Sequence, residues 1–403
     1  MRLSQKQLFK LLFSGALITA CGAIHAQSVI TTCAELNAMR SGNDYVLGND
    51  LDCSDYHYTT IAGVFQGTLD GNDHTISNLT IHRARSNRSG LFDGISDATI
   101  QNIHFENVNI PVNFDGSKAD QGLIAGAVFY YGENTISNIK VSGLQIGNQN
   151  AAGFTGGIIG RIPGATLTLS DIHINNASMR NNFGSAGGLI GLSSGHVRII
   201  DSSVHALTSI NANHDCGKWF ESNDPDEDEP TYHFYNRCSF GGLIGDVAAG
   251  TVEVARSSAT GNIINTLYAG GMIGIASGEI YISDSYTLMA VAAEKSAGGI
   301  VGGATNKTTT LTHVYTAGAV KLWGLEYSGH AVIGSGSKHL AGIESYFDKQ
   351  SSLSAHSGDD FSTGLTTAEI QASPSNFNFK FGLWEPIFWK FEEGAYPSLI
   401  IAQ

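Results

Sequence analysis

The chain has 403 residues and a formal net charge of −14, and only 14% of its residues are charged. This balance argues against a general nucleic-acid binder, because phosphate binding needs clustered Lys and Arg, and against adsorption to anionic lipid. A hydrophobic fraction of 42% is enough for a sizeable core.

Residues 1–26 have the layout of a secretory signal peptide. A basic stretch precedes an apolar run over 11–20 that is too short to span a bilayer, and small residues lead to Ala26. We favour ordinary signal-peptidase cleavage after Ala26, while a lipobox-like sequence ending at Cys21 leaves lipid anchoring open. No second apolar run of about 20 residues follows, so no membrane-spanning helix is expected. The chain is therefore predicted to be exported, either secreted or at the cell surface, with the periplasm or a lipid anchor at Cys21 as alternatives.

Four cysteines follow the signal segment in two local groups. In an exported protein, Cys33 with Cys53 and Cys216 with Cys238 predict two disulfides that close short loops. A stacked array of strands leaves an unpaired edge at each end. Residues 27–88 are therefore predicted to form an N-terminal cap and the first coils, with a helical turn at 34–40 held by the first disulfide.

A glycine motif recurs across the predicted repeat region, residues 89–350. Its closing glycines, separated by 28 to 34 residues except for one gap of 54, are Gly94, Gly126, Gly160, Gly191, Gly245, Gly274, Gly302 and Gly334. Downstream of each glycine, a two-residue alternation such as Asn138-Ile139-Lys140-Val141 indicates a strand with one buried face. A unit of about 30 residues cannot bury this face alone, so stacked copies should pair in parallel around an aliphatic core. The sequence therefore predicts an all-β parallel β-helix, with glycines where backbones approach closely.

The repeated Gly-Gly-Leu-Ile-Gly copies, at 187–191 and with variations elsewhere, resemble the Glug motif of bacterial surface and secreted proteins. The segments at 33–36, 65–71 and 396–399 are similar to the same proteins. The resemblance covers about residues 30–400 and implies a right-handed parallel β-helix in a filamentous-haemagglutinin-like adhesin architecture. It implies little chemistry, because the motif marks a scaffold that occurs with varied companions.

Parallel β-helices include polysaccharide lyases and hydrolases, so catalytic fragments have to be considered. The best are Asp70 and Asp73 with His74, and His196 with Arg198. Neither has acidic partners at equivalent positions one coil away, as acid–base or calcium chemistry would need. The sequence has no nucleophile elbow, phosphate loop or metalloprotease helix. No catalytic residue is therefore assigned.

The gap of 54 residues predicts an insertion at 211–240, on what is often the binding face of a solenoid. Its acidic run places Asp224, Asp226 and Asp228 at alternate positions, where oxygen ligands could hold calcium; a solvated acidic loop is the alternative. No other cofactor is predicted. Zinc is a weaker interpretation because the spacing matches no usual pattern. Its ligands would be His214, Cys216, His233 and Cys238.

Residues 351–403 are predicted to close the array. Thr366 and Glu369 fit a capping box that opens a short helix. Eight aromatic residues then crowd together and favour a hydrophobic plug over a carbohydrate platform. They are Phe377, Phe379, Phe381, Trp384, Phe388, Trp389, Phe391 and Tyr396.

Together these features predict an exported, non-catalytic, adhesin-like β-helical protein. It would bind a glycan or protein partner outside the cytoplasm, and no nucleic-acid partner is expected. A polysaccharide-acting lyase or hydrolase and a structural component of an envelope or matrix are the alternative functions.

Overall fold

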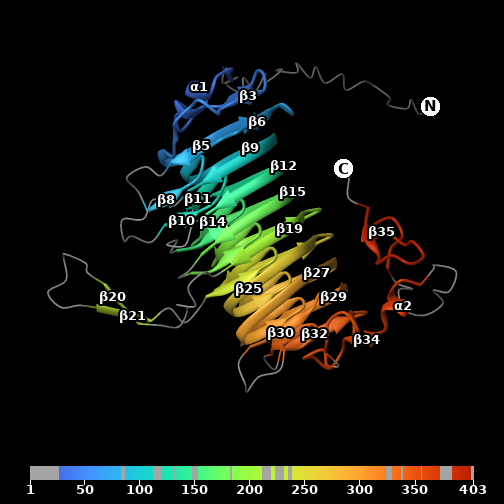
Figure 1. Cartoon of the computed structure of the whole chain (residues 1–403). Helices are drawn as coiled ribbons and strands as arrows, with labels where there is room; N and C mark the ends of the chain where they lie inside the picture. Colours follow the sequence, from blue (N-terminus) through green and yellow to red (C-terminus); the bar gives the residue numbers. More distant parts are fainter. Residues whose placement is uncertain are drawn as a thin grey trace, which may run out of the picture.

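The protein is a parallel β-helix. The computed structural model describes residues 27–82, 87–111, 119–129, 132–147, 153–181, 184–210, 219–222, 231–234, 238–305, 307–323, 329–336, 339–354, 356–372 and 384–400. Within these residues, 30 strands form one continuous sheet system in which each coil pairs in parallel with the coils before and after it. Figure 1 shows the coils stacked in sequence order from blue to orange. The predicted fold class is confirmed.

Two long ladders of strands make up one side of each coil. The first consists of β1 (Ser28–Ile30), β2 (Tyr45–Leu47), β5 (Ile61–Asp70), β9 (Phe92–Ile110), β12 (Glu133–Ile146), β15 (Thr166–Arg180), β18 (His196–Ile200), β24 (Thr251–Ala255), β27 (Glu279–Gly298), β29 (Thr309–Thr316) and β32 (Leu340–Ile343). The second shares the longest strands and adds β3 (Leu51–Asp52), β6 (Thr75–Ser77), β19 (Ser203–Ile210), β25 (Ser258–Gly270), β30 (Val320–Leu322), β33 (Tyr346–Asp348) and β34 (Thr363–Leu365).

The glycine motifs form the opposite, narrow edge of the coils. Their first arms are β8 (Arg88–Ser89), β10 (Asp120–Gln121), β13 (Thr155–Gly156), β16 (Ala186–Gly187) and β22 (Ser239–Gly241). Their second arms are β11 (Ala125–Val128), β14 (Ile159–Ile162), β17 (Ile190–Ser193), β23 (Ile244–Val247), β26 (Ile273–Ala276), β28 (Val301–Ala304) and β31 (Ile333–Ser335). Smaller pairs are β4 (Tyr58–Thr59) with β7 (Ile81–His82), and β35 (Trp389–Lys390) with β36 (Ser398–Leu399).

Equivalent apolar residues stack into one core along the solenoid. One column, in which no residue is more than 1% exposed, contains Ile100, Ile136, Leu169, Ile199, Val254, Ile282 and Leu311. Neighbouring columns join it in a single buried cluster that extends from Ile30 to Phe347. The dry aliphatic core expected from the repeat is therefore present, and its burial is the main force that holds the coils together.

Each glycine motif brings two coils into close backbone contact. A Cβ added at the second glycine of the motif, Gly188, would lie 2.1 Å from the carbonyl oxygen of Gly242, the equivalent glycine in the next coil. Likewise, a Cβ added at Gly157 would lie 2.0 Å from the carbonyl oxygen of Gly188. Only glycine fits at this edge, because any side chain would displace the neighbouring coil.

A column of left-handed residues turns the chain between the two long ladders. Its members and their φ angles are Asn102 (56°), Asn138 (48°), Asp171 (57°), Asp201 (50°), Arg256 (47°), Asp284 (43°), His313 (52°) and Glu344 (48°). Asn and Asp accept this conformation more readily than other non-glycine residues, which accounts for their recurrence. The side chains also bond along the column: Asn138 Nδ2 donates to Asn102 Oδ1 at 2.9 Å, and Arg256 makes two bonds to the Asp201 carboxylate at 2.6 and 2.8 Å.

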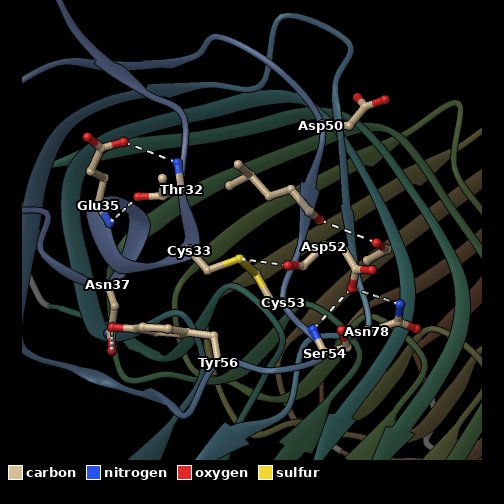
Figure 2. Close-up of a disulfide and its surroundings, with 12 residues drawn as sticks. Thr32, Cys33, Glu35, Asn37, Asp50, Asp52, Cys53, Ser54, Tyr56 and Asn78 are labelled. Carbon is tan, nitrogen blue, oxygen red and sulfur yellow. Dashed lines mark hydrogen bonds between the residues drawn. A yellow bond between two sulfur atoms is a disulfide. The ribbon is translucent and has the colours of Figure 1, made fainter.

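A short helix and the predicted Cys33–Cys53 disulfide lie at the N-terminal end of the solenoid. Helix α1 (Cys33–Asn37) begins at the N-cap Thr32, whose hydroxyl accepts from the Glu35 N–H while the Glu35 carboxylate accepts from the Thr32 N–H. The Cys33–Cys53 disulfide ties this helix to the chain after β3 (Figure 2). Asn37 extends the anchorage, since its side chain bonds both the N–H and the carbonyl of Thr59 in β4.

The C-terminal aromatic segment is buried, but it does not close the end of the array. Trp384 and Trp389 are 3% and 2% exposed and pack against outward-facing Tyr286, Tyr315 and Tyr346 of three successive coils. We call residues 384–400 the strap; Figure 1 shows its strand β35 beside the stack of coils. Burial of the two indoles supports a packing role over a carbohydrate platform. The expectation that the segment plugs the end is wrong for these described residues.

The last coil is covered instead by the chain that precedes the strap. Phe361 lies so close to Gly342 of β32 that a Cβ there would come within 2.1 Å of the ring, and it packs against the main core. Helix α2 (Thr367–Ile370) follows, with Thr366 as N-cap and Glu369 completing the predicted capping box. The plug residues Phe377, Phe379 and Phe381 lie outside the described residues, as does the predicted signal segment 1–26 with Cys21.

Candidate functional site

The insertion leaves the solenoid at a corner that also varies in other coils. In each of four coils the chain passes this corner between a long strand and the first arm of a glycine motif. The connection is nine residues long between β9 and β10, eight between β12 and β13, five between β15 and β16, and 28 between β19 and β22. Because the largest difference in length falls at this position in these four coils, we call it the insertion corner.

The ladders on both sides of the insertion stay in register. Before it, Arg180 pairs with Ile210; after it, Ala186 pairs with Phe240. The core positions Ile199 and Val254 are adjacent in the stack although they are 55 residues apart in the chain. The coils before and after the insertion therefore stack on one another directly.

The insertion contains an antiparallel hairpin of its own. Strands β20 (Trp219–Ser222) and β21 (Thr231–Phe234) pair only with each other, with Trp219 opposite Phe234. Figure 1 shows this hairpin standing away from the body of the solenoid. Residues 211–218, 223–230 and 235–237 lie outside the described residues, and so do the calcium candidates Asp224, Asp226 and Asp228. The calcium hypothesis stays a prediction.

The end of the insertion is anchored to the next coil at Cys238. This residue is buried and disulfide-bonded, and its carbonyl accepts hydrogen bonds from the Thr266 hydroxyl at 2.8 Å and the Tyr268 N–H at 3.2 Å. The predicted partner Cys216, like His214, lies outside the described residues. A disulfide-bonded sulfur cannot serve as a zinc thiolate, so the zinc interpretation of the cysteine pair is wrong.

Buried polar groups fix the corner just before the insertion. Asn181 is fully buried, and its amide donates to the Gly153 carbonyl at 2.8 Å and accepts from the Gly184 N–H at 3.0 Å. Ser185 and Ser239 Oγ atoms, one coil apart, lie 3.0 Å from each other. The insertion therefore leaves a wall of the solenoid that is held by buried hydrogen bonds.

Two arginines and a half-buried carboxyl group occupy the same corner nearer the N-terminus. Asp120 accepts a hydrogen bond from the Phe154 N–H at 3.3 Å. Burial raises the pKa of Asp120 to about 6, although the charges of Arg161 and Arg88 and that hydrogen bond act to lower it. Each arginine also lies over an aromatic ring: Arg88 Cζ is 4.8 Å from the ring centroid of Phe129, and Arg161 Cζ is 5.6 Å from that of Phe154.

Sequence reasoning missed this arginine–aspartate group. The sequence feature that could have revealed this group is the residue two positions before the first glycine of each motif. Two early copies have a charged residue there, Arg88 and Asp120, whereas three later copies have a serine, namely Ser185, Ser239 and Ser296. Charged residues at that position face outward at the corner, and only the stacking of coils brings Asp120 between the two arginines.

In the first candidate catalytic fragment, Asp70 and Asp73 form hydrogen bonds that hold a turn of the chain. Asp70 accepts hydrogen bonds from the side chains of Gln101 (2.8 Å) and Asn102 (3.0 Å) and from the Asn72 N–H (2.8 Å). Burial raises its pKa, but these bonds outweigh that effect and leave the pKa below its ordinary value. Asp73 accepts from Asn138 Nδ2 at 3.2 Å.

His74 completes the first fragment and points to a different partner. Its Nδ1 lies 3.0 Å from Asp50 Oδ1, and the pKa of Asp50 is lowered first by the Thr75 N–H and then by His74. The second fragment is exposed: His196 stands on β18, and Arg198 pairs with Glu253 at 3.1 Å on the next coil. The structure does not bring the two fragments together.

The described residues hold no group of three or more His, Cys, Asp or Glu side chains placed to bind a metal ion. In the same part of the chain, neither helix has the length and apolar character needed to cross a membrane.

Comparisons with known proteins identify similarity to much longer molecules. Residues 29–143 match the family described as the M26 IgA1-specific metallo-endopeptidase N-terminal region. Halomucin of Haloquadratum walsbyi (strain DSM 16790 / HBSQ001) is 42% identical over 93 residues, which are 23% of this chain and 1% of halomucin. The immunoglobulin A1 protease of Streptococcus sanguinis is 26% identical over 253 residues, 62% of this chain and 11% of that protein. The chain thus spans only a small part of the curated relatives it matches.

A solved structure of a candidate immunoglobulin A1 protease from Bacteroides ovatus has 15% identity and a TM-score of 0.42, over 94% of this chain and 93% of that one. Taken together, the sequence matches connect residues 29–143 with the N-terminal region of the M26 metallo-endopeptidases, and the coordinates establish a parallel β-helix with one large insertion.

Proposed function

We propose that this chain is an exported, adhesin-like β-helical protein that binds a glycan or protein partner outside the cytoplasm through the insertion at 211–240. The observation that carries the proposal is that the pairing of the coils resumes across the insertion, with Arg180 opposite Ile210 before it and Ala186 opposite Phe240 after it. The hairpin that the insertion contains, β20 with β21, adds no strand to the ladders of the solenoid.

The composition of the insertion suits a contact surface. It joins the aromatic residues Trp219, Phe220, Tyr232 and Phe234 to an acidic run at 224–229. Aromatic side chains provide large contact areas at little conformational cost, and acidic groups at a rim favour basic partners and raise association rates. The similarity to halomucin and to an immunoglobulin A1 protease supports a location outside the cytoplasm, in keeping with the predicted signal peptide and Glug-type repeats.

The experiment replaces the insertion by the corner of the preceding coil. Because Arg180 is equivalent to Ile210 and Ser185 to Ser239, residues 211–238 can be exchanged for Asn-Asn-Phe-Gly, the sequence of 181–184, with both cysteines removed. The secreted protein and this variant are then tested on glycan and cell-surface arrays. We expect binding to be lost while the thermal unfolding transition is retained.

A matched control keeps the insertion and removes a surface ion pair on another face, with Arg198→Ala and Glu253→Ala together. Its binding should equal that of the wild type. If the variant without the insertion still binds its targets, the insertion is not the contact site. Turnover of any polysaccharide, abolished by Asp70→Asn or His196→Ala, would favour an enzyme instead.

A further inference from the structure

The last coil contains a cleft of about 520 Å³ that no part of the proposed function uses. It lies between β31 and β32 on one side and the chain at 356–361 on the other, and it is lined by His330, Leu340, His356, Asp359, Asp360 and Phe361 with three small residues. Its volume is in the range of sites for small organic ligands, on the order of 300–1,000 Å³.

One wall of the cleft is held to the preceding coil by backbone hydrogen bonds. The chain at 356–358 is bonded to the preceding coil: Ala331 N–H donates to the His356 carbonyl at 2.8 Å, and Ile333 N–H to the Ser357 carbonyl at 2.9 Å. Gly358 has a φ of +85°, and a Cβ there would lie 1.8 Å from the Ile333 carbonyl oxygen. The cleft therefore exists before any ligand binds, which lowers the entropic penalty of binding.

The two sides of the cleft differ in chemistry. Leu340 and Phe361 are half-buried and pack against the main core, so they offer an apolar floor. The Asp359 carboxylate is held in place, because Oδ1 accepts from the Phe361 and Ser362 N–H groups and Oδ2 from the Ser362 hydroxyl. Asp360 and His356 are exposed at the rim. His330 donates from Nδ1 to the Gly334 carbonyl, which fixes the orientation of its ring at the edge of the cleft.

We propose that this cleft binds one or two residues of a neutral or amino sugar. A sugar ring has an apolar C–H face that fits the Leu340 and Phe361 floor, and hydroxyl groups that donate to carboxylates and exchange hydrogen bonds with imidazoles. The carboxylates of Asp359 and Asp360 make the electrostatic potential of the cleft more negative, which disfavours uronic acids, sialic acids and phosphates.

Saccharide binding is measured on the secreted protein by ligand-observed NMR and calorimetry, with the methyl glycosides of glucose, galactose and mannose, glucosamine and glucuronic acid as probes. We expect at least one neutral or amino sugar to bind and glucuronic acid to bind at least about tenfold more weakly. If glucuronic acid binds as well as or better than every neutral probe, or no probe binds at millimolar concentration, the proposal is wrong.

Two kinds of variant locate the binding. His356→Ala and Asp360→Asn each remove an exposed polar group and should weaken binding about tenfold, while Asp55→Asn, an exposed aspartate at the other end of the solenoid, should not change it. Gly336→Leu fills the cleft, since the nearest atom to a Cβ there is the flexible Leu340 Cδ1 at 3.1 Å, and should abolish binding without lowering the unfolding temperature. Sugar binding that survives both His356→Ala and Gly336→Leu refutes the assignment.

This site is separate from the insertion. The variant in which residues 211–238 are replaced keeps the cleft and should bind the sugar as the wild type does. Loss of sugar binding in that variant would place the sugar at the insertion and overturn the present inference, whereas Gly336→Leu leaves the proposed function of the insertion untouched.

Discussion

The narrow glycine edge can be tested by adding a single methyl group at Gly188. The φ angle of this residue is not left-handed, so an alanine would be acceptable to the backbone on its own. Its Cβ would, however, lie 2.1 Å from the Gly242 carbonyl oxygen and 2.9 Å from Val204 Cγ1. The ordinary van der Waals distance between a Cβ and a carbonyl oxygen is more than 3 Å, so the two paired coils must move apart by about 1 Å. This separation weakens the backbone hydrogen bonds between the coils.

The expected cost follows from overpacking in a rigid core. Such insertions destabilise by about 1–3 kcal/mol, and the backbone position of the obstructing atom places Gly188→Ala near the upper end of that range. Thermal and urea unfolding followed by circular dichroism should show a lower midpoint. Hydrogen exchange should show the largest loss of protection in β16, β17 and β23, the strands around the contact.

Two glycine controls separate steric from conformational effects. At Gly303 an added Cβ meets three side-chain atoms and no backbone atom among its nearest neighbours: Ser335 Oγ at 3.1 Å, Tyr268 Cδ1 at 3.4 Å and Ile275 Cγ1 at 3.6 Å. Gly303→Ala should therefore change the free energy of unfolding by less than about 1 kcal/mol. At Gly42 nothing lies within 4 Å but φ is +83°, so Gly42→Ala should cost about 1–2 kcal/mol through backbone strain alone. Equal stability of Gly188→Ala and Gly303→Ala would refute the close-contact explanation of the motif.

Three further predictions concern the two ends and the insertion corner. Replacing Cys33 and Cys53 by serine opens a loop of sequence separation 20 and should lower stability by about 3 kcal/mol in chemical unfolding; an unchanged midpoint would show that the helix is held by its other contacts. The pKa of Asp120 in the folded protein is about 6, above its ordinary value. Its ionisation therefore lowers the free energy of unfolding as the pH rises from about 4 to about 6, and this loss of stability stays constant at higher pH. Asp120→Asn should therefore stabilise the protein at pH 7 by up to about 3 kcal/mol and have little effect at pH 4, and the reverse order would contradict the assigned direction. Trp389→Ala should release the strap at a cost of about 3–5 kcal/mol, seen as faster exchange in β35 and β36 with β9 to β15 unaffected.

The solenoid was predictable because its determinants are local and repeated. Alternation in segments such as Asn138-Ile139-Lys140-Val141 sets which side chains are buried, and the spacing of glycines sets the length of a coil. Asn or Asp at the turn and the capping box at Thr366 act within a few residues of themselves. Such features depend on backbone conformation and need no knowledge of distant contacts.

The place of the strap could not be read in the same way. Aromatic residues at 384–396 indicate that something apolar is covered, but not which surface. The covered surface consists of Tyr286, Tyr315 and Tyr346, which fall at equivalent positions of three coils and point outward. The repeat places these tyrosines in one column. That column could have indicated, from the sequence, that another segment packs against the side of the stack.

The arginine–aspartate group at the insertion corner and the cleft in the last coil arise only from contacts between coils. Arg88, Asp120 and Arg161 belong to three different coils, and burial that raises the pKa of Asp120 is a property of the assembled wall. The cleft likewise depends on how the chain at 356–361 returns over β32.

The chain alone specifies the coil, its turns, its buried face and the point where extra residues are inserted, because each of these follows from side-chain periodicity and backbone preferences over a few residues. The stacked structure decides which outward surfaces are covered, which charges meet and where a cavity remains, because those depend on the distances between residues that lie one or more coils apart.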